Sequence, residues 1–182
     1  MFENIKQCQK CDLCCNQSPL LDTPSKCQIF WVGLSAKMVY NKNDTPLSPN
    51  TNTGHIIHRI EESYEDVVSY KTNLVKCVPL SDSKKIRYPN RKEIKCCIDY
   101  LQEEIEVLSP KIVFLLGEKV CSSISKHYSI EFEKWDSFNY SYKLINNVYY
   151  VPIHHPSYIH VYKRKHVNLY IESIQQVIDS LL

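Results

Sequence analysis

The sequence lacks any apolar run approaching the roughly 20 residues of a membrane span. Its first residues, MFENIKQCQKCDLC, also contain no apolar stretch long enough for a signal peptide. No internal repeat, linker or low-complexity segment interrupts the chain. These absences argue against a membrane protein and a secreted one, so we expect a cytoplasmic protein with no membrane partner.

The chain also has little net charge, because 22 Lys and Arg stand against 20 Asp and Glu. That balance neither requires nor excludes a nucleic-acid partner, so local charge must decide the point. The 182 residues, 43% of them hydrophobic, are enough to bury one core. We expect a single domain over residues 1–182, and a monomer.

Nine cysteines are many for a compartment that keeps thiols reduced, which favours a metal or a cluster over disulfides. Cys8 and Cys11 form a C-x2-C pair, while Cys77 and Cys97 lie far along the chain. Thiolates are soft ligands that suit either zinc or an iron–sulfur centre. The spacing does not separate the two, and Cys77 and Cys97 could equally be ordinary buried core cysteines.

Strand and helix patterns alternate along the chain. Because helices that connect parallel strands cover both faces of a sheet, this order predicts a layered α/β fold with a mostly parallel sheet. The expected strands are residues 27–34, 73–78, 111–117, 142–145 and 148–153, and the expected helices are 90–108, 118–126 and 167–181. Asn146 and Asn147 predict a tight hairpin turn, since both tolerate positive φ.

Six segments in a fixed order resemble the iron–sulfur type uracil-DNA glycosylases, commonly called families 4 and 5. They are Cys8-x2-Cys11-x-Leu13, FWVGLSAK, TNLVKCVPL, NRKEIKCCIDYL, SPKIVFLLG and PIHHPSYI, and together they span residues 8–159. The resemblance implies a three-layer α/β/α sandwich with a central, mostly parallel, four-stranded sheet. It also implies a DNA glycosylase that flips a nucleotide out of DNA and hydrolyses the N-glycosidic bond of uracil, leaving an abasic site.

The resemblance assigns the cysteines. The family's four cluster ligands fall on Cys8, Cys11, Cys77 and Cys97, which implies a [4Fe–4S] cluster and makes residues 1–26, approximately, a cluster-binding segment. Cys96 beside Cys97 makes the register ambiguous. The flanking Glu-Ile upstream and Tyr-Leu downstream favour Cys97.

Two side chains carry the catalytic roles that the resemblance implies. Asn73 would read the hydrogen-bonding edge of the flipped base, since an amide offers both a donor and an acceptor. His155 would donate to the oxyanion that develops on the departing base. From the residues alone, Asn73 could be an ordinary strand-end asparagine, and His154 competes with His155.

The segment after His155 would contact DNA. Pro156 and Ser157 resemble the family's phosphate-pinching loop, and Tyr158 occupies the position that fills the gap left by the flipped base. The basic residues Lys163, Arg164 and Lys165 follow, and a second basic stretch holds Lys84, Lys85, Arg87, Arg91 and Lys92. Such runs can track phosphates, although a charge run is more often a solvated face.

The first family motif, G-E-x-P-G, is altered. Here Gly33 is followed by Leu34 and Ser35, and Leu47 with Ser48 stands where the family has an aromatic residue that stacks on the base. These five residues and Asn73 are the expected base pocket. Because the acid is missing, either another acid such as Asp44 serves, or His155 and electrostatics carry the reaction, or catalysis is lost.

Three hypotheses follow from this remodelled pocket. The substrate base is uracil or a bulkier modified pyrimidine, the latter as in modified phage DNA. A second function class is a catalytically inactive iron–sulfur protein that binds DNA or another partner. The enzyme is expected to be monofunctional, because the matched catalytic motifs contain no lysine except Lys37. A Schiff base at Lys37 is the alternative.

Overall fold

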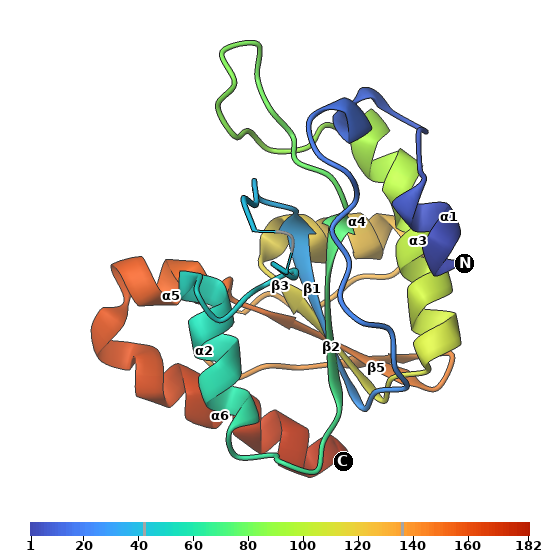
Figure 1. The fold of residues 1–182 in the computed structure, drawn as a ribbon. Helices are drawn as coiled ribbons and strands as arrows, with labels where there is room; N and C mark the ends of the chain where they lie inside the picture. The colour runs from blue at the N-terminus through green and yellow to red at the C-terminus, as the bar shows by residue number, and fades with distance from the viewer. Residues whose placement is uncertain (42, 136) are drawn as a thin grey trace.

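Five strands form one sheet in the computed structural model, which describes residues 1–41, 43–135 and 137–182 (Figure 1). The strands lie in the order β2-β1-β3-β5-β4, and all neighbours pair in parallel except β4 and β5. The elements are α1 (Phe2–Lys6), the 3-10 helix η1 (Asp12–Cys15), β1 (Ile29–Ser35), α2 (Asn52–Glu61), β2 (Ser69–Val75), α3 (Arg91–Leu108), β3 (Ile112–Leu116), α4 (Glu118–Tyr128), β4 (Lys143–Ile145), β5 (Val148–Ile153), α5 (Pro156–Tyr162), the 3-10 helix η2 (Arg164–His166) and α6 (Val167–Leu181).

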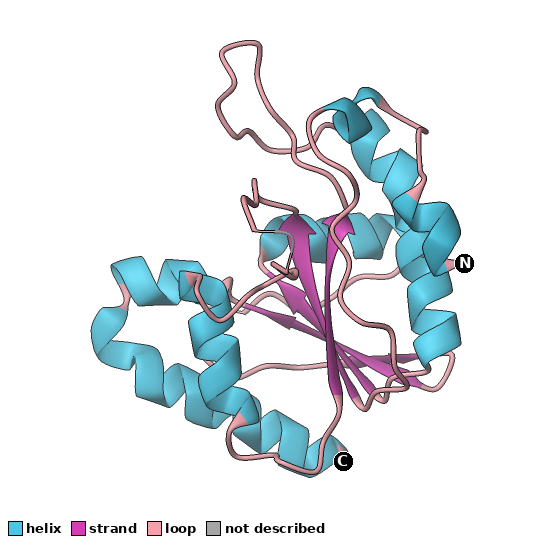
Figure 2. Ribbon diagram, viewed as in Figure 1, coloured by secondary structure: helices cyan, strands magenta, loops and turns pink. Residues whose placement is uncertain are grey.

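Helices cover both faces of the sheet, which confirms the expected three-layer α/β/α sandwich (Figure 2). On one face Trp31 and Phe114 stack at 4.4 Å between ring centroids and pack with buried residues of α2, α5 and α6. On the other face Phe30 and Val113 pack with α3 and α4. Successive residues of β1 therefore point to opposite layers, as the strand period of two requires.

The sheet has five strands, as the strand patterns along the chain predict, whereas the resemblance implies four. The additional strand is β4, three residues long, which pairs antiparallel with β5 at the edge. The turn between them confirms the hairpin prediction, because Asn146 and Asn147 have φ of 50° and 64°.

Helix α3 begins and ends where its local signals predict. The Asn90 side chain accepts a hydrogen bond from the Glu93 backbone N–H, and the Glu93 side chain accepts one from the Asn90 N–H, which completes a capping box. Ser109 takes a left-handed conformation just before Pro110, and the helix stops there.

Two expectations were wrong. The strand expected at residues 73–78 is β2, which begins at Ser69 and ends at Val75, so Asn73 lies near its carboxyl end. Helix α2 was not among the expected helices. It begins at the N-cap Thr51, whose hydroxyl accepts the Gly54 N–H at 3.0 Å, and it buries Ile56 against the sheet.

The C-terminal helix α6 docks on the sheet as expected, with Tyr170, Ile174 and Ile178 fully buried. Within the described ranges, no helix has the length and apolar character needed to cross a membrane. Because the four parallel strands run in one direction, the segments that follow them gather at the same end of the sheet, where the strands have their carboxyl ends (Figure 1). Those segments hold most of the candidate site residues.

Candidate active site and cysteine pocket

Gly33 and Asn73 lie side by side near the carboxyl ends of β1 and β2, where the two residues are paired in register. The approach is close, because a Cβ on Gly33 would lie 2.3 Å from Asn73 Oδ1 and 3.0 Å from Leu47 Cδ2. A side chain at position 33 would therefore displace the Asn73 amide and Leu47. The structure thus brings together Gly33, Leu47 and Asn73, three of the residues expected in the base pocket.

The loop that carries Leu47 is held in an unusual conformation. Leu47 has φ of 53°, in the left-handed region that non-glycine residues rarely adopt. The loop crosses directly over Gly54, where a Cβ would lie 2.0 Å from the Ser48 carbonyl oxygen. Ser48 also accepts the Thr51 N–H at 2.9 Å, so it forms the turn that leads into α2.

Asn73 is only 3% exposed, and its carboxamide makes no hydrogen bond to the residues that the structure describes. Among these residues no fully buried side-chain nitrogen or oxygen lacks a partner, so the amide keeps a small contact with solvent. Its backbone is fixed, since the Lys76 ammonium donates to the Asn73 carbonyl oxygen at 2.7 Å. A rigid backbone with a free side-chain amide leaves one donor group and one acceptor for a ligand.

Lys76 belongs to a fully buried polar network between β2 and α3. Its ammonium donates to Thr72 Oγ1 at 2.8 Å and forms an ion pair with Glu104, and both charged side chains are at most 1% exposed. Tyr70 donates to Glu104 at 3.1 Å from the same strand. Buried charges are tolerated only when paired in this way.

His155 is the N-cap of α5, and its ring is oriented by its neighbours. Nδ1 accepts the Ser157 backbone N–H at 3.3 Å and lies 2.8 Å from Ser157 Oγ. An acceptor Nδ1 carries no proton, so the neutral ring carries it on Nε2. Burial, with the nearby Lys37 charge, lowers the pKa of His155 to about 4, which keeps the imidazole neutral at physiological pH.

Gly117, directly after β3, packs closely against the His155 side chain. It has φ of 88°, and a Cβ there would lie 3.2 Å from His155 Cβ. His154 points elsewhere, because its Nδ1 lies 2.8 Å from the Tyr140 hydroxyl and its carbonyl accepts from Tyr170 at 2.7 Å. The two histidines therefore have different surroundings, and His154 belongs to an aromatic cluster.

Leu34 and Ser35 differ from the other expected pocket residues. Leu34 packs against the core beneath α3 and α4, whereas Leu47 packs against the core on the opposite face. Ser35, the last residue of β1, is half-buried and paired with Val75. The structure thus uses Leu34 for packing rather than placing it beside Leu47.

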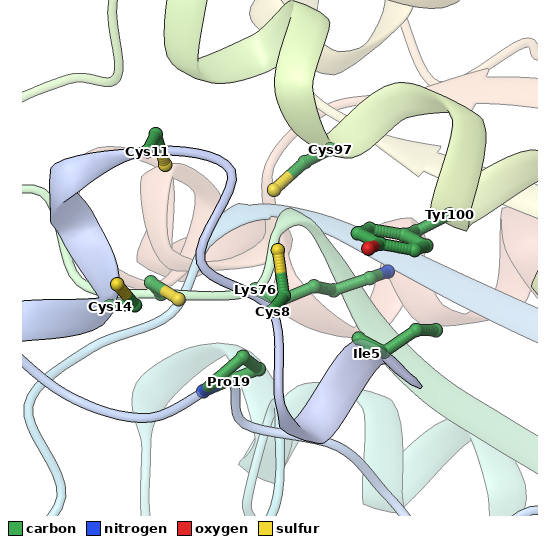
Figure 3. A pocket seen from close by; sticks show the side chains of 9 residues that line it. Ile5, Cys8, Cys11, Cys14, Pro19, Lys76, Cys97 and Tyr100 are labelled. Atoms are coloured by element: carbon green, nitrogen blue, oxygen red, sulfur yellow. The ribbon is translucent and has the colours of Figure 1, made fainter. Parts of the chain in front are cut away.

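Five cysteines from three parts of the chain line one pocket (Figure 3). The lining residues are Ile5, Cys8, Cys11, Cys14, Pro19, Lys76, Cys77, Cys97 and Tyr100. Cys96 lies outside this pocket, and its thiol donates to the Lys10 carbonyl at 3.5 Å. The four sequence-predicted ligands are therefore together, with Cys14 as an additional thiol that the sequence reasoning did not assign.

The chemistry of these thiols suits a bound soft metal. Burial raises the pKa of Cys77 to about 12 and also raises that of Cys97, so uncompensated thiolates would be unfavourable there. Iron or zinc supplies the positive charge that stabilises them. Across the described ranges, no three His, Cys, Asp or Glu side chains have the compact arrangement that holds a single metal ion.

The expected DNA-contacting residues lie beyond His155. Pro156 is buried as the first residue of α5, and Ser157 is held by His155, so this segment is a helical turn rather than the expected loop. Tyr158 is 44% exposed. Lys163 is half-buried, whereas Arg164 and Lys165 are exposed on η2.

The sequence model of the family described as the uracil DNA glycosylase superfamily matches residues 26–178. The chain belongs to this superfamily. The matched range contains Gly33, Asn73 and His155, and it begins after the N-terminal cysteines.

Two archaeal superfamily members are similar to this chain. The type-4 uracil-DNA glycosylase of Saccharolobus solfataricus is 28% identical over 168 residues, which cover 85% of this chain and 73% of that protein. The type-4 uracil-DNA glycosylase of Pyrobaculum aerophilum is 41% identical over 46 residues, 25% of this chain and 21% of that protein. The first of these similarities extends over most of both chains.

The crystal structure of wild-type SMUG2 from Pedobacter heparinus has a similar fold. It superposes with a TM-score of 0.53 at 13% identity, covering 88% of this chain and 77% of that one. At this identity the likeness concerns the fold alone, and it agrees with the superfamily membership.

Proposed function

We propose that this member of the uracil-DNA glycosylase superfamily is a DNA glycosylase that removes uracil or a modified pyrimidine from DNA. The main support for the proposal is the end of the sheet where the parallel strands have their carboxyl ends. It holds Asn73, nearly buried and with an amide that makes no described hydrogen bond but still reaches solvent, and a neutral, oriented His155. The names of the type-4 relatives support the same activity.

Asn73 would read the flipped base. Gly33 and Leu47 lie beside its amide, so a base that binds there would meet a donor, an acceptor and apolar neighbours. A base with a mismatched edge would leave the buried amide unpaired, which costs about 1–3 kcal/mol. That penalty provides the selectivity.

His155 would stabilise the leaving base. Breaking the C1′–N bond moves the electron pair onto the base and leaves positive charge on the sugar, to which water then adds. A neutral imidazole with its proton on Nε2 can donate to the developing base oxyanion without being deprotonated first. Ser157 keeps Nδ1 as the acceptor and so fixes this tautomer.

The family's acid has no counterpart at Leu34, which packs in the core. More of the transition-state stabilisation therefore falls on His155 and Asn73. The loop with Leu47 and Ser48 is remodelled relative to the family motif, and this supports a bulkier modified pyrimidine, as in modified phage DNA, as the alternative to uracil.

A base-release screen tests the proposal. Purified protein is incubated with single-stranded and duplex oligonucleotides that carry uracil or modified pyrimidines, and liberated bases are identified by mass spectrometry. His155→Ala and Asn73→Ala should each slow single-turnover release by at least about 100-fold, whereas His154→Ala should have a milder effect. Tight DNA binding with no base release from any substrate would instead identify a non-catalytic DNA-binding protein.

The cysteine pocket would hold a [4Fe–4S] cluster through Cys8, Cys11, Cys77 and Cys97. When bound, such a cluster supplies thiolate–iron bonds that cross-link the N-terminal segment, the end of β2 and helix α3. Tyr100 and Ile5 would shield it on the protein side. Anaerobic purification followed by iron, sulfide and zinc analysis tests this assignment, and stoichiometric zinc without iron would overturn it.

The remaining assignments have their own measurements. A monofunctional enzyme leaves an intact abasic strand and is not trapped on DNA by borohydride, whereas a Schiff base at Lys37 would be trapped. A monomer elutes at the mass of one chain, 21.4 kDa. We also propose a role in base-excision repair and, with it, a cytoplasmic location.

A further inference from the structure

Two tyrosines on α5 are exposed next to the proposed active site. Tyr158 is 44% exposed and Tyr162 is 75% exposed. Their positions differ by four residues, so the rings lie on one face of the helix, with centroids 5.4 Å apart and planes tilted by 37°. Such a contact can stabilise the helix slightly, but it leaves most of the Tyr162 ring in contact with water.

The pair extends an aromatic row that begins at His154, the residue before His155. His154 lies 6.4 Å from Tyr158 between ring centroids, with ring planes only 12° apart. The row therefore runs from His154 through Tyr158 to Tyr162, where one ring remains mostly exposed. The last ring has no aromatic neighbour beyond it among the described residues.

The chain segment that carries this row has charge of one sign, although Glu118 of α4 lies near His154. Residues 154–171 contain no Asp or Glu, and Lys163, Arg164 and Lys165 follow Tyr162 directly. A row of exposed rings beside a basic track is the arrangement by which proteins bind unpaired nucleic-acid strands, since rings stack on bases and lysines follow phosphates. Paired bases stack on each other and do not present their faces to such rings.

We propose that Tyr162 stacks on an unpaired base that flanks the flipped nucleotide, so the protein favours its target in single-stranded DNA. Tyr162 lies seven residues after His155, about 10 Å along α5 at 1.5 Å per residue. The base that reaches it is therefore a neighbour of the target and not the target itself. This inference rests on the proposed glycosylase function for its target, but its test measures binding alone.

The test compares dissociation constants for matched single-stranded and duplex oligonucleotides, measured by fluorescence anisotropy with a non-cleavable target nucleotide. Tyr162→Ala should weaken single-strand binding by about tenfold, the scale of one base–aromatic stack, and duplex binding by less than about twofold. Tyr162→Phe, which keeps the ring, should retain single-strand affinity. Tyr142→Ala is the matched control, since Tyr142 is 47% exposed but lies beside the edge strand β4.

Equal losses on both substrates, or no loss on either, would overturn the stacking proposal. So would a Tyr162→Phe protein as weak as Tyr162→Ala, because that result assigns the effect to the hydroxyl. If the strand-selective loss appears but no substrate releases a base, the stacking surface stands and the glycosylase proposal fails. If a base is released but Tyr162→Ala causes no strand-selective loss of affinity, the glycosylase proposal stands and the stacking proposal fails.

Discussion

The buried ion pair between Lys76 and Glu104 gives the sharpest stability prediction. Lys76→Met would leave the Glu104 carboxylate buried with only the Tyr70 and Thr72 hydroxyls, and it would remove the donor to the Asn73 carbonyl. Removing one partner of a buried pair typically costs about 3–5 kcal/mol, since the remaining charge keeps its desolvation penalty. We therefore expect the free energy of unfolding to fall by about that amount, measured by urea denaturation.

Two control variants test whether the unpaired buried charge causes the loss of stability in Lys76→Met. Lys6→Met breaks the exposed pair with Glu3, whose side chains are 56% and 73% exposed, and should change stability by no more than about 0.5 kcal/mol. Lys76→Met combined with Glu104→Leu removes both charges and should cost less than the sum of the single variants. A Lys76→Met cost below about 1 kcal/mol, or strict additivity in the double variant, would refute the reasoning.

The same network touches the proposed site, because the Lys76 ammonium holds the Asn73 carbonyl. Where Lys76→Met still folds, its single-turnover base release should fall more than its DNA affinity does, since phosphate contacts dominate binding. An equal loss of both quantities would indicate general unfolding instead.

Three further predictions concern other parts of the molecule. Cys97→Ala should lose iron and stability, whereas Cys96→Ala, which changes a thiol outside the pocket, should retain both. Because the pKa of His155 is lowered to about 4 from an unfolded value near 6.5, the unfolded state binds more protons between these values. Stability should therefore fall as pH drops through that window, and His155→Gln should show a shallower fall in urea titrations at pH 7 and 5. Replacing Lys163 and Arg164 with alanine should make the dependence of DNA affinity on salt shallower, and an unchanged slope would remove both from the interface.

Local signals explain which elements the sequence predicts well. The hairpin depends on Asn146 and Asn147, two adjacent residues with positive φ, and α3 depends on a capping box within four residues. By contrast α2 has a cap, Thr51, inside a polar stretch, and its start depends on Gly54 passing under the Ser48 carbonyl. That contact joins residues six positions apart through a turn in which Leu47 has positive φ, and the apolar periodicity of the sequence does not reveal such a turn.

The candidate site shows the same division. Motif resemblance assigns Asn73, His155 and the four cysteines, because each sits in a recognisable short segment. The buried partners are different, since Glu104 lies 28 residues from Lys76 and neither stands in a pattern that demands the other. Cys14 likewise enters the pocket only through the fold of the N-terminal segment.

The position of Leu34 bears on how the active site can differ from that of its relatives. In the family motif the residue after the first glycine is an acid, whereas here it is Leu34, which packs beneath α3 and α4. Gly33 and Leu47 border Asn73. An apolar side chain gains free energy by such burial, whereas a carboxylate in the same contacts would be desolvated. Leucine at this position therefore removes the acid, and its packing also stabilises the end of β1. At this end of the sheet lie the Asn73 side chain, on a backbone held by Lys76, and the neutral His155 imidazole, the two groups that the proposed mechanism uses to stabilise a departing base without a carboxylate at position 34.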